Sequence, residues 1–72
     1  MKTSNCILVS TTNNKFKYIE NKQGLLYYIK DYSAKFLYND RFLITSNVNS
    51  IIEDNEYIKL ITLNSIYIFK KI

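Results

Sequence analysis

The clearest structural signal in the chain is Ala34-Lys35-Phe36-Leu37-Tyr38-Asn39-Asp40-Arg41-Phe42-Leu43-Ile44-Thr45. Two runs rich in aromatic and branched residues flank the pair Asn39-Asp40. Because Asn and Asp tolerate a left-handed backbone, this pair suits the type I′ turn that joins two antiparallel strands. The sequence therefore predicts a tight hairpin in which Tyr38 lies opposite Arg41.

Further strands are predicted on both sides of this hairpin. They are Cys6–Val9, Lys15–Ile19, Val48–Ile52, Tyr57–Leu63 and Ile66–Lys71, with turns at Ser10–Asn14, Glu53-Asp54-Asn55 and Asn64-Ser65. The continuous apolar run Cys6–Val9 suits a strand buried on both faces, and Lys15–Ile19 alternates polar and aromatic residues. We expect these two segments to form a first hairpin. Gly24 takes positive φ freely, so we also expect a turn there.

The segment Leu25–Tyr38 carries two conflicting patterns. Apolar residues recur at helical spacing, which would make residues 25–37 a helix in an α+β fold. Its tyrosines and isoleucine favour strands, and Asp31–Ala34 suits a turn that divides the segment. We favour two strands. The chain then holds six or seven short strands in an all-β fold, an antiparallel meander closed into a barrel or compact sandwich.

Size and composition limit the possible architectures. The 72 residues suffice for a single domain spanning residues 1–72, and 47% of them are hydrophobic. Because so small a chain cannot bury all of its hydrophobic surface, we expect it to self-associate as a dimer. No apolar run is long enough for a signal peptide or membrane helix. We therefore expect a cytoplasmic protein without a membrane partner, which agrees with a single free cysteine.

Catalytic chemistry finds little support in the sequence. There is no His and only one Cys, Cys6, which lies in an apolar run. The same counts exclude an intrachain disulfide and a His/Cys metal site. The single Gly cannot form a phosphate-binding loop, and residues 53–56 lack calcium-ligand spacing and are interpreted as a solvated acidic turn. We therefore predict no enzyme activity, no cofactor and no metal, but a binding protein.

Aromatic and basic residues alternate along residues 27–41. The candidate partner-binding residues of this region are Tyr32, Lys35, Tyr38 and Arg41. Small β-barrels bind single-stranded nucleic acid by stacking bases on such rings while cations follow the backbone. The alternative, which we favour, is that the rings form the core and the lysine stems cover them.

The C-terminal hairpin supplies two more candidates, Lys59 and Lys70. If Asn64-Ser65 is a two-residue turn, these lysines lie directly opposite one another, and like charges in that position are destabilising. Either Glu53 or Asp54 neutralises the pair, which we favour, or an anionic partner does.

Two segments of the C-terminal half, Phe42–Ile51 and Ile61–Phe69, carry the pattern TS-x-V-x-x-I … T-x-N-S-x-Y. This pattern resembles small phage and prophage proteins, some of which inhibit bacterial defence systems, including anti-CRISPR proteins. The resemblance implies a mobile-element origin, a β-sheet C-terminal half and, as partner, a larger host protein or ribonucleoprotein. It supplies no binding residues, because the matched positions suit turns and core.

Two functions therefore remain open. The first is an inhibitor that blocks a CRISPR-type nucleic-acid enzyme by protein–protein contact. The second is a small β-barrel that binds single-stranded RNA or DNA directly. The formal net charge of +4 excludes an acidic mimic of nucleic acid.

Overall fold

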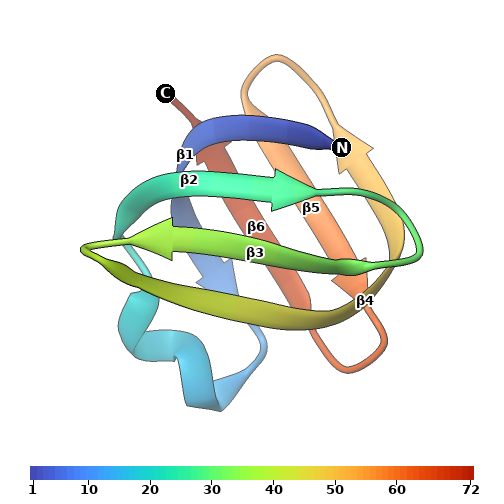
Figure 1. Ribbon diagram of the computed structural model, residues 1–72, viewed down its shortest axis with the longest axis horizontal. Helices are drawn as coiled ribbons and strands as arrows, with labels where there is room; N and C mark the ends of the chain where they lie inside the picture. Colours follow the sequence, from blue (N-terminus) through green and yellow to red (C-terminus); the bar gives the residue numbers. More distant parts are fainter.

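The computed structural model describes residues 1–72 and consists mainly of strands (Figure 1). The elements are β1 (Lys2–Thr11), the short 3-10 helix η1 (Asn14–Ile19), β2 (Gln23–Tyr28), β3 (Ser33–Tyr38), β4 (Arg41–Glu53), β5 (Tyr57–Thr62) and β6 (Ile66–Lys71). Each strand pairs antiparallel with the next, and β6 pairs back with β1. The result is a closed six-stranded barrel, which confirms the predicted all-β meander.

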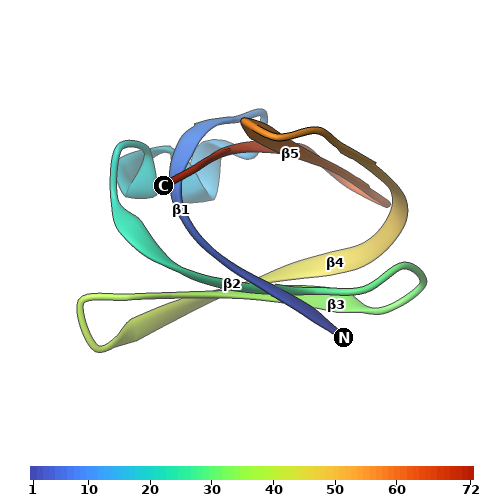
Figure 2. The ribbon, with the colours of Figure 1, turned by 90° about the horizontal axis from the view of Figure 1, so that it is seen from above.

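The barrel is flattened, with extents of 27 × 26 × 18 Å. Seen from above, β2, β3 and the first part of β4 form one layer, and β5 and β6 form the other (Figure 2). β1 and β4 cross from one layer to the other. The inward-facing side chains fill the space between the layers with aromatic and aliphatic groups: Cys6, Leu8, Ile19, Leu26, Tyr28, Ala34, Phe36, Tyr38, Leu43, Val48, Ile58, Leu60, Tyr67 and Phe69.

The central hairpin forms as its sequence predicts. Asn39 and Asp40 have φ values of 47° and 61°, as a type I′ turn requires, and Tyr38 pairs with Arg41. The ambiguous segment upstream forms two strands, β2 and β3, with Asp31 at φ 76° in the loop between them. The residues at helical spacing therefore share no single face: Tyr28 and Phe36 face the core from two strands, whereas Tyr32 is exposed in the loop.

The prediction of a first hairpin between Cys6–Val9 and Lys15–Ile19 is wrong. Residues 14–19 form η1, and β1 pairs instead with β2 and β6. The Asn13 side chain accepts a hydrogen bond from the Lys15 N–H at 3.0 Å, which caps the start of η1. Burial of Ile19 fixes its end. This six-residue helix is two turns long. No helix in the structure could cross a membrane.

Gly24 is required for a different reason from the one predicted. Its φ is not positive; Asn21, with φ 73°, provides the left-handed residue of that turn. Gly24 lies inside β2, where a Cβ atom would come within 2.1 Å of the Leu37 carbonyl oxygen on β3. Glycine is therefore needed for the close approach of two backbones.

Two strands differ from their predicted form because the sheet bends. The two strands expected within residues 41–52 are one strand, β4, with a register shift between Val48 and Ser50 where it passes to the second layer. β1 bends in the same way between Leu8 and Ser10, and Val9 is left exposed. The run Cys6–Val9 is therefore not buried on both faces.

Candidate functional site

In the predicted acidic turn, Asp54 and Glu56 are exposed, but Glu53 is partly buried and is the centre of an ion-pair network. The Glu53 carboxylate accepts hydrogen bonds from Lys71 Nζ at 2.7 Å, Tyr28 Oη at 2.9 Å and Lys2 Nζ at 3.3 Å. Lys71 is the largest cause that lowers the pKa of Glu53, while partial burial opposes it. Burial and the carboxylate together raise the pKa of Tyr28. The network lies at the end of the barrel where β1 begins and where β4 and β6 end. We call this the Glu53 end.

The neighbouring acids are also used within the fold. Asp54 Oδ1 accepts the backbone N–H groups of Glu56 and Tyr57 at 2.8 Å each, and these bonds lower the pKa of Asp54. Lys71 Nζ donates to the Asp54 carbonyl at 2.7 Å. No three potential metal ligands of the His, Cys, Asp or Glu type come together. Asp54 therefore acts as the side chain that closes the β4–β5 turn.

Cys6 faces the core. Its side chain is fully buried, and burial raises the pKa of the thiol to about 12. A protonated thiol without access to solvent is a poor nucleophile.

The expected pairing of Lys59 with Lys70 is wrong. Lys59 pairs with Ile68, and Lys70 pairs with Tyr57. The turn lies one residue earlier than predicted, because the Thr62 N–H donates to the Ser65 carbonyl at 2.8 Å and leaves Leu63 and Asn64 between the two paired residues. The two lysines are therefore diagonal neighbours on the outer surface, and neither takes part in an ion pair.

The prediction that Glu53 or Asp54 neutralises these two lysines is also wrong, because neither carboxylate pairs with them. Glu53 is paired with Lys2 and Lys71 instead, and the Asp54 carboxylate accepts only backbone groups of its own turn. Because neither lysine sits opposite a like charge, the repulsion that called for a counter-charge does not arise.

The rings of residues 27–41 divide between core and surface. Tyr28, Phe36 and Tyr38 are buried, as we favoured, whereas Tyr32 is 65% exposed in the β2–β3 loop. Since Tyr38 is buried while Arg41 is exposed, the pair forms no stacked contact at the surface. The cation–π contact of this hairpin is Lys35 Nζ, 4.7 Å from the Phe42 ring centroid.

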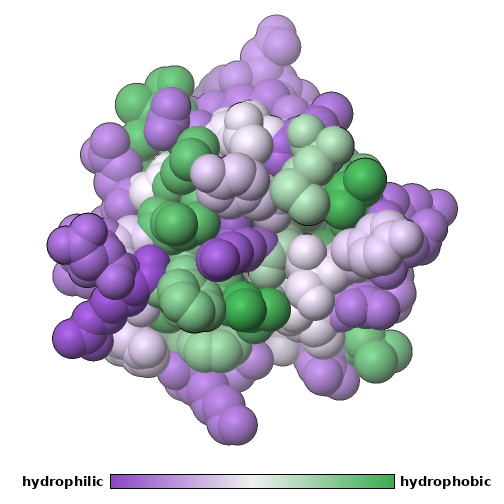
Figure 3. Space-filling view, in the orientation of Figure 1, coloured by the Kyte–Doolittle hydropathy of each residue, from purple (hydrophilic) through white to green (hydrophobic).

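The outward-facing side chains of β2, β3 and the first part of β4 form a mostly apolar surface, which we call the front face. It consists of two cross-strand rows, Leu25–Leu37–Phe42 and Tyr27–Lys35–Ile44. Phe42 and Ile44 are 57% and 51% exposed. Hydrophobic side chains gather over these strands in the space-filling view (Figure 3).

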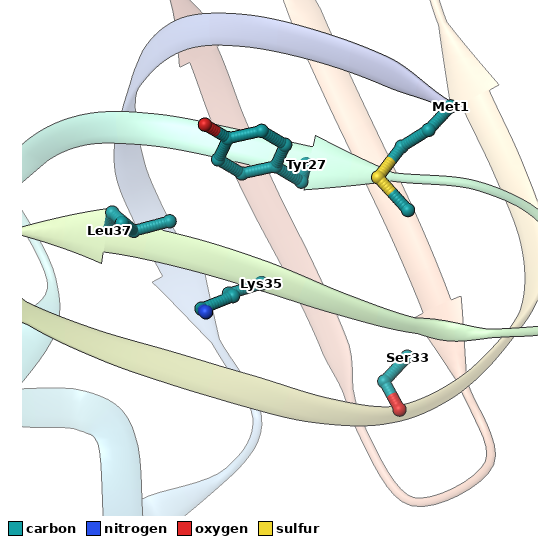
Figure 4. Close-up of a pocket in the computed structure, with 5 residues that line it drawn as sticks. All are labelled: Met1, Tyr27, Ser33, Lys35 and Leu37. Atoms are coloured by element: carbon teal, nitrogen blue, oxygen red, sulfur yellow. The ribbon is translucent and has the colours of Figure 1, made fainter.

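Lys35 stands near the middle of the front face without a carboxylate partner. Beside it is a shallow hollow of about 400 Å³, lined by Met1, Tyr27, Ser33, Lys35 and Leu37 (Figure 4). Side chains from β2 and β3 and the first residue of the chain point outward around it. The front face thus offers apolar groups around one free cation.

A second hollow, the Tyr18 hollow, lies at the opposite end of the barrel from the Glu53 end. Its volume is about 460 Å³, and its lining residues are Tyr18, Lys22, Tyr38, Asn39 and Arg41. Tyr38 and Arg41 were expected from the sequence as partner-binding residues, whereas Tyr18 and Lys22 were not. The sequence placed Tyr18 on a strand. The antiparallel pairing of β2 with β3 brings residues of the β1–β2 connection beside the β3–β4 turn.

The predicted site residues therefore separate into four places. Lys35 belongs to the front face, Tyr38 and Arg41 to the Tyr18 hollow, Tyr32 to the β2–β3 loop, and Lys59 and Lys70 to the outer surface of the second layer. No family model matches the chain, and neither the curated proteins nor the solved structures compared with it gave a match. The geometry of these surfaces is consequently the basis for the function proposed below.

Proposed function

We propose that the protein is a non-catalytic binding protein that contacts a larger protein through the front face. The observation that supports this is a sheet surface on which Phe42 and Ile44 are more than half exposed around an unpaired Lys35. Aromatic and aliphatic side chains gathered on one surface are typical of the centre of protein interfaces.

The charge of the front face defines its partner. The Lys35 ammonium lies over the Phe42 ring and meets no carboxylate. A carboxylate surrounded by apolar side chains would pair with Lys35 and cover Phe42 and Ile44 at the same time. The partner is therefore an amphipathic protein segment with an acidic residue in the middle of its apolar surface.

A second copy of the chain fits the front face less well. A two-fold axis through this surface would bring two Lys35 ammonium groups toward each other with no acid between them. The dimer expected from composition remains a prediction, and sedimentation equilibrium measures it. A dimer that Phe42→Ala dissociates would assign the front face to self-association and contradict our proposal.

Two short peptides test the chemistry of the front face. One carries a glutamate at the centre of its apolar side, and the other carries glutamine there. We expect the glutamate peptide to bind a few-fold more tightly in NMR titrations, since an exposed ion pair contributes about 0.5–1 kcal/mol. The largest shifts should lie at Lys35, Leu37 and Phe42.

Two lysine variants complete this experiment. Lys35→Gln should abolish the preference for the glutamate peptide. Lys59→Gln is the control and should retain it, because Lys59 also lies between apolar residues, Ile52 and Ile68, but outside the front face. Equal binding of both peptides to the unmodified protein would rule out a partner with a central carboxylate.

We further propose that the contact blocks a CRISPR-type defence enzyme, the partner class suggested by the resemblance to phage-encoded inhibitors. Phage plating on cells with active CRISPR immunity should rise when the protein is expressed, and Phe42→Ser with Ile44→Ser should remove the effect. Ile52→Ser with Leu63→Ser is the matched control, because these apolar residues are also more than half exposed but lie outside the front face. No rise in plating would reject the inhibitor role without affecting the peptide result.

A further inference from the structure

Tyr18 is an exposed ring on a firmly held backbone. Its side chain is 65% exposed, but the next residue, Ile19, is buried in the core. The following turn is attached to β1, because the Asn21 N–H donates to the Leu8 carbonyl at 2.7 Å. A ring held in this way loses little conformational entropy when a ligand stacks on it.

The Tyr18 hollow has an excess of positive charge. Lys22 and Arg41 line it and form no ion pair. The nearby Glu20 is engaged by Lys17 at 3.9 Å and by a backbone N–H. Asp40 lies in the adjoining turn but does not line the hollow. Two cations are thus available to an anion.

Tyr38 adds a hydrogen-bond donor to this site. Burial raises the pKa of its hydroxyl, the neighbouring Tyr18 raises it further, and Arg41 lowers it. Because the net direction is upward from a value of 10.0, the hydroxyl is protonated at neutral pH. The hollow therefore combines a stacking ring, two cations and a neutral O–H group.

We propose that the Tyr18 hollow binds one nucleotide unit of a single-stranded nucleic acid. The phosphate lies between Lys22 and Arg41, and the base stacks on the ring of Tyr18. The volume of about 460 Å³ lies within the range of roughly 300–1,000 Å³ that ligand sites have. This site is distinct from the front face and does not depend on the function proposed for it.

A single strand fits the observations better than other polyanions. An acidic peptide would pair with the cations but leave the Tyr18 ring unused. Bases in a duplex are stacked on each other and present no free face, whereas every unpaired base presents one. Stacking of this kind is tolerant of sequence, so we expect weak base preference.

Fluorescence anisotropy with a labelled oligouridylate tests the site. The comparison probes are an abasic oligonucleotide of equal length, an RNA duplex and poly-glutamate. We expect oligouridylate to bind most tightly, the abasic strand less tightly, and the duplex and poly-glutamate least. Tyr18→Ala should weaken oligouridylate binding at least about fivefold and leave the abasic strand unaffected. Tyr32→Ala, which removes an equally exposed ring, should change neither.

The cations are tested by two charge-matched pairs of substitutions. Lys22→Ala with Arg41→Ala should lower the slope of log affinity against log salt by about 0.7, the contribution of one phosphate contact on a single strand. Lys59→Ala with Lys70→Ala removes the same charge from the other layer and should preserve the slope.

Three results would overturn the proposal. The first is that oligouridylate does not bind. The second is that the Tyr32 variant or the Lys59 and Lys70 variant loses as much affinity or salt dependence as its counterpart in the hollow. The third is that poly-glutamate binds as tightly as oligouridylate, which would assign the hollow to an acidic protein. All the affected residues lie outside the front face, so the peptide experiment stays an independent test of the function proposed there.

Discussion

The two ends of the barrel use their cations in opposite ways. At the Glu53 end, Lys2 and Lys71 both meet one carboxylate, and Lys71 also bonds to a backbone carbonyl. At the end with the Tyr18 hollow, Lys22 and Arg41 meet no carboxylate. Charge at the first end is neutralised within the fold, while charge at the second end is available to a partner.

The difference shows that net charge alone does not locate a binding site. Lys71 and Arg41 are both basic residues at strand ends, and the sequence does not distinguish them. The position of Glu53, where four strand ends converge, makes one end a structural network. We therefore expect the stability of the Glu53 end to depend on charge and the stability of the other end to depend on close packing.

The largest effect is expected for Gly24→Ala, two residues after Lys22 of the Tyr18 hollow. The new Cβ would lie 2.1 Å from the Leu37 carbonyl oxygen, so β2 and β3 must separate. We expect the free energy of unfolding to fall by about 3 kcal/mol, measured by chemical denaturation. The exposed neighbour Gln23 provides the control, since Gln23→Ala should change the free energy of unfolding by less than about 0.5 kcal/mol. Similar values for both variants would show that the backbones adjust without loss.

Glu53→Gln should have the next largest effect. It removes the charge that Lys2, Lys71 and the buried Tyr28 hydroxyl share. We expect a loss of about 1–3 kcal/mol in the free energy of unfolding, the range for hydrogen bonds to charged groups. Glu56→Gln, at an exposed acid without an ion pair, should be nearly neutral. If the two variants are equally stable, the network does not stabilise the fold.

Acid should weaken the Glu53 end selectively. In the folded protein, the pKa of Glu53 lies below its ordinary value of 4.5. Its contribution to stability is therefore complete above 4.5 and is lost as the pH falls through the folded pKa. Each unit by which the pKa is lowered corresponds to about 1.4 kcal/mol.

Thermal unfolding between about pH 6 and pH 3 measures this dependence. The midpoint should fall less steeply in Glu53→Gln than in the unmodified protein. The residual slope comes in part from Asp54, whose pKa is also lowered. Identical slopes would mean that Glu53 titrates alike in the folded and unfolded states.

The smallest effects compare one cation from each end. Lys71→Ala should reduce the free energy of unfolding by about 1 kcal/mol, because Lys71 bonds to Glu53 and to the Asp54 carbonyl. Arg41→Ala should change it by less than about 0.5 kcal/mol. A greater loss for Arg41→Ala, measured by the same denaturation, would show that its charge serves the fold rather than a partner.

Local chemistry by itself determined the central part of this protein. The Asn39-Asp40 turn, the pairing of Tyr38 with Arg41 and the division of residues 25–38 into two strands follow from preferences that act within a few residues. The β-rich character follows in the same way from the many branched and aromatic residues. These features could be predicted because they do not depend on distant parts of the chain.

The tertiary structure decided the remaining features. Lys2 and Glu53 are 51 positions apart, and Tyr18 and Arg41 meet only because the β1–β2 connection reaches the β3–β4 turn. Gly24 is explained by a carbonyl on another strand, and Lys59 lies opposite Ile68 because of hydrogen bonds between Thr62 and Ser65. The physical reason is that closing a barrel fixes every register at once, and the partners thereby brought together have no spacing in the sequence that announces them.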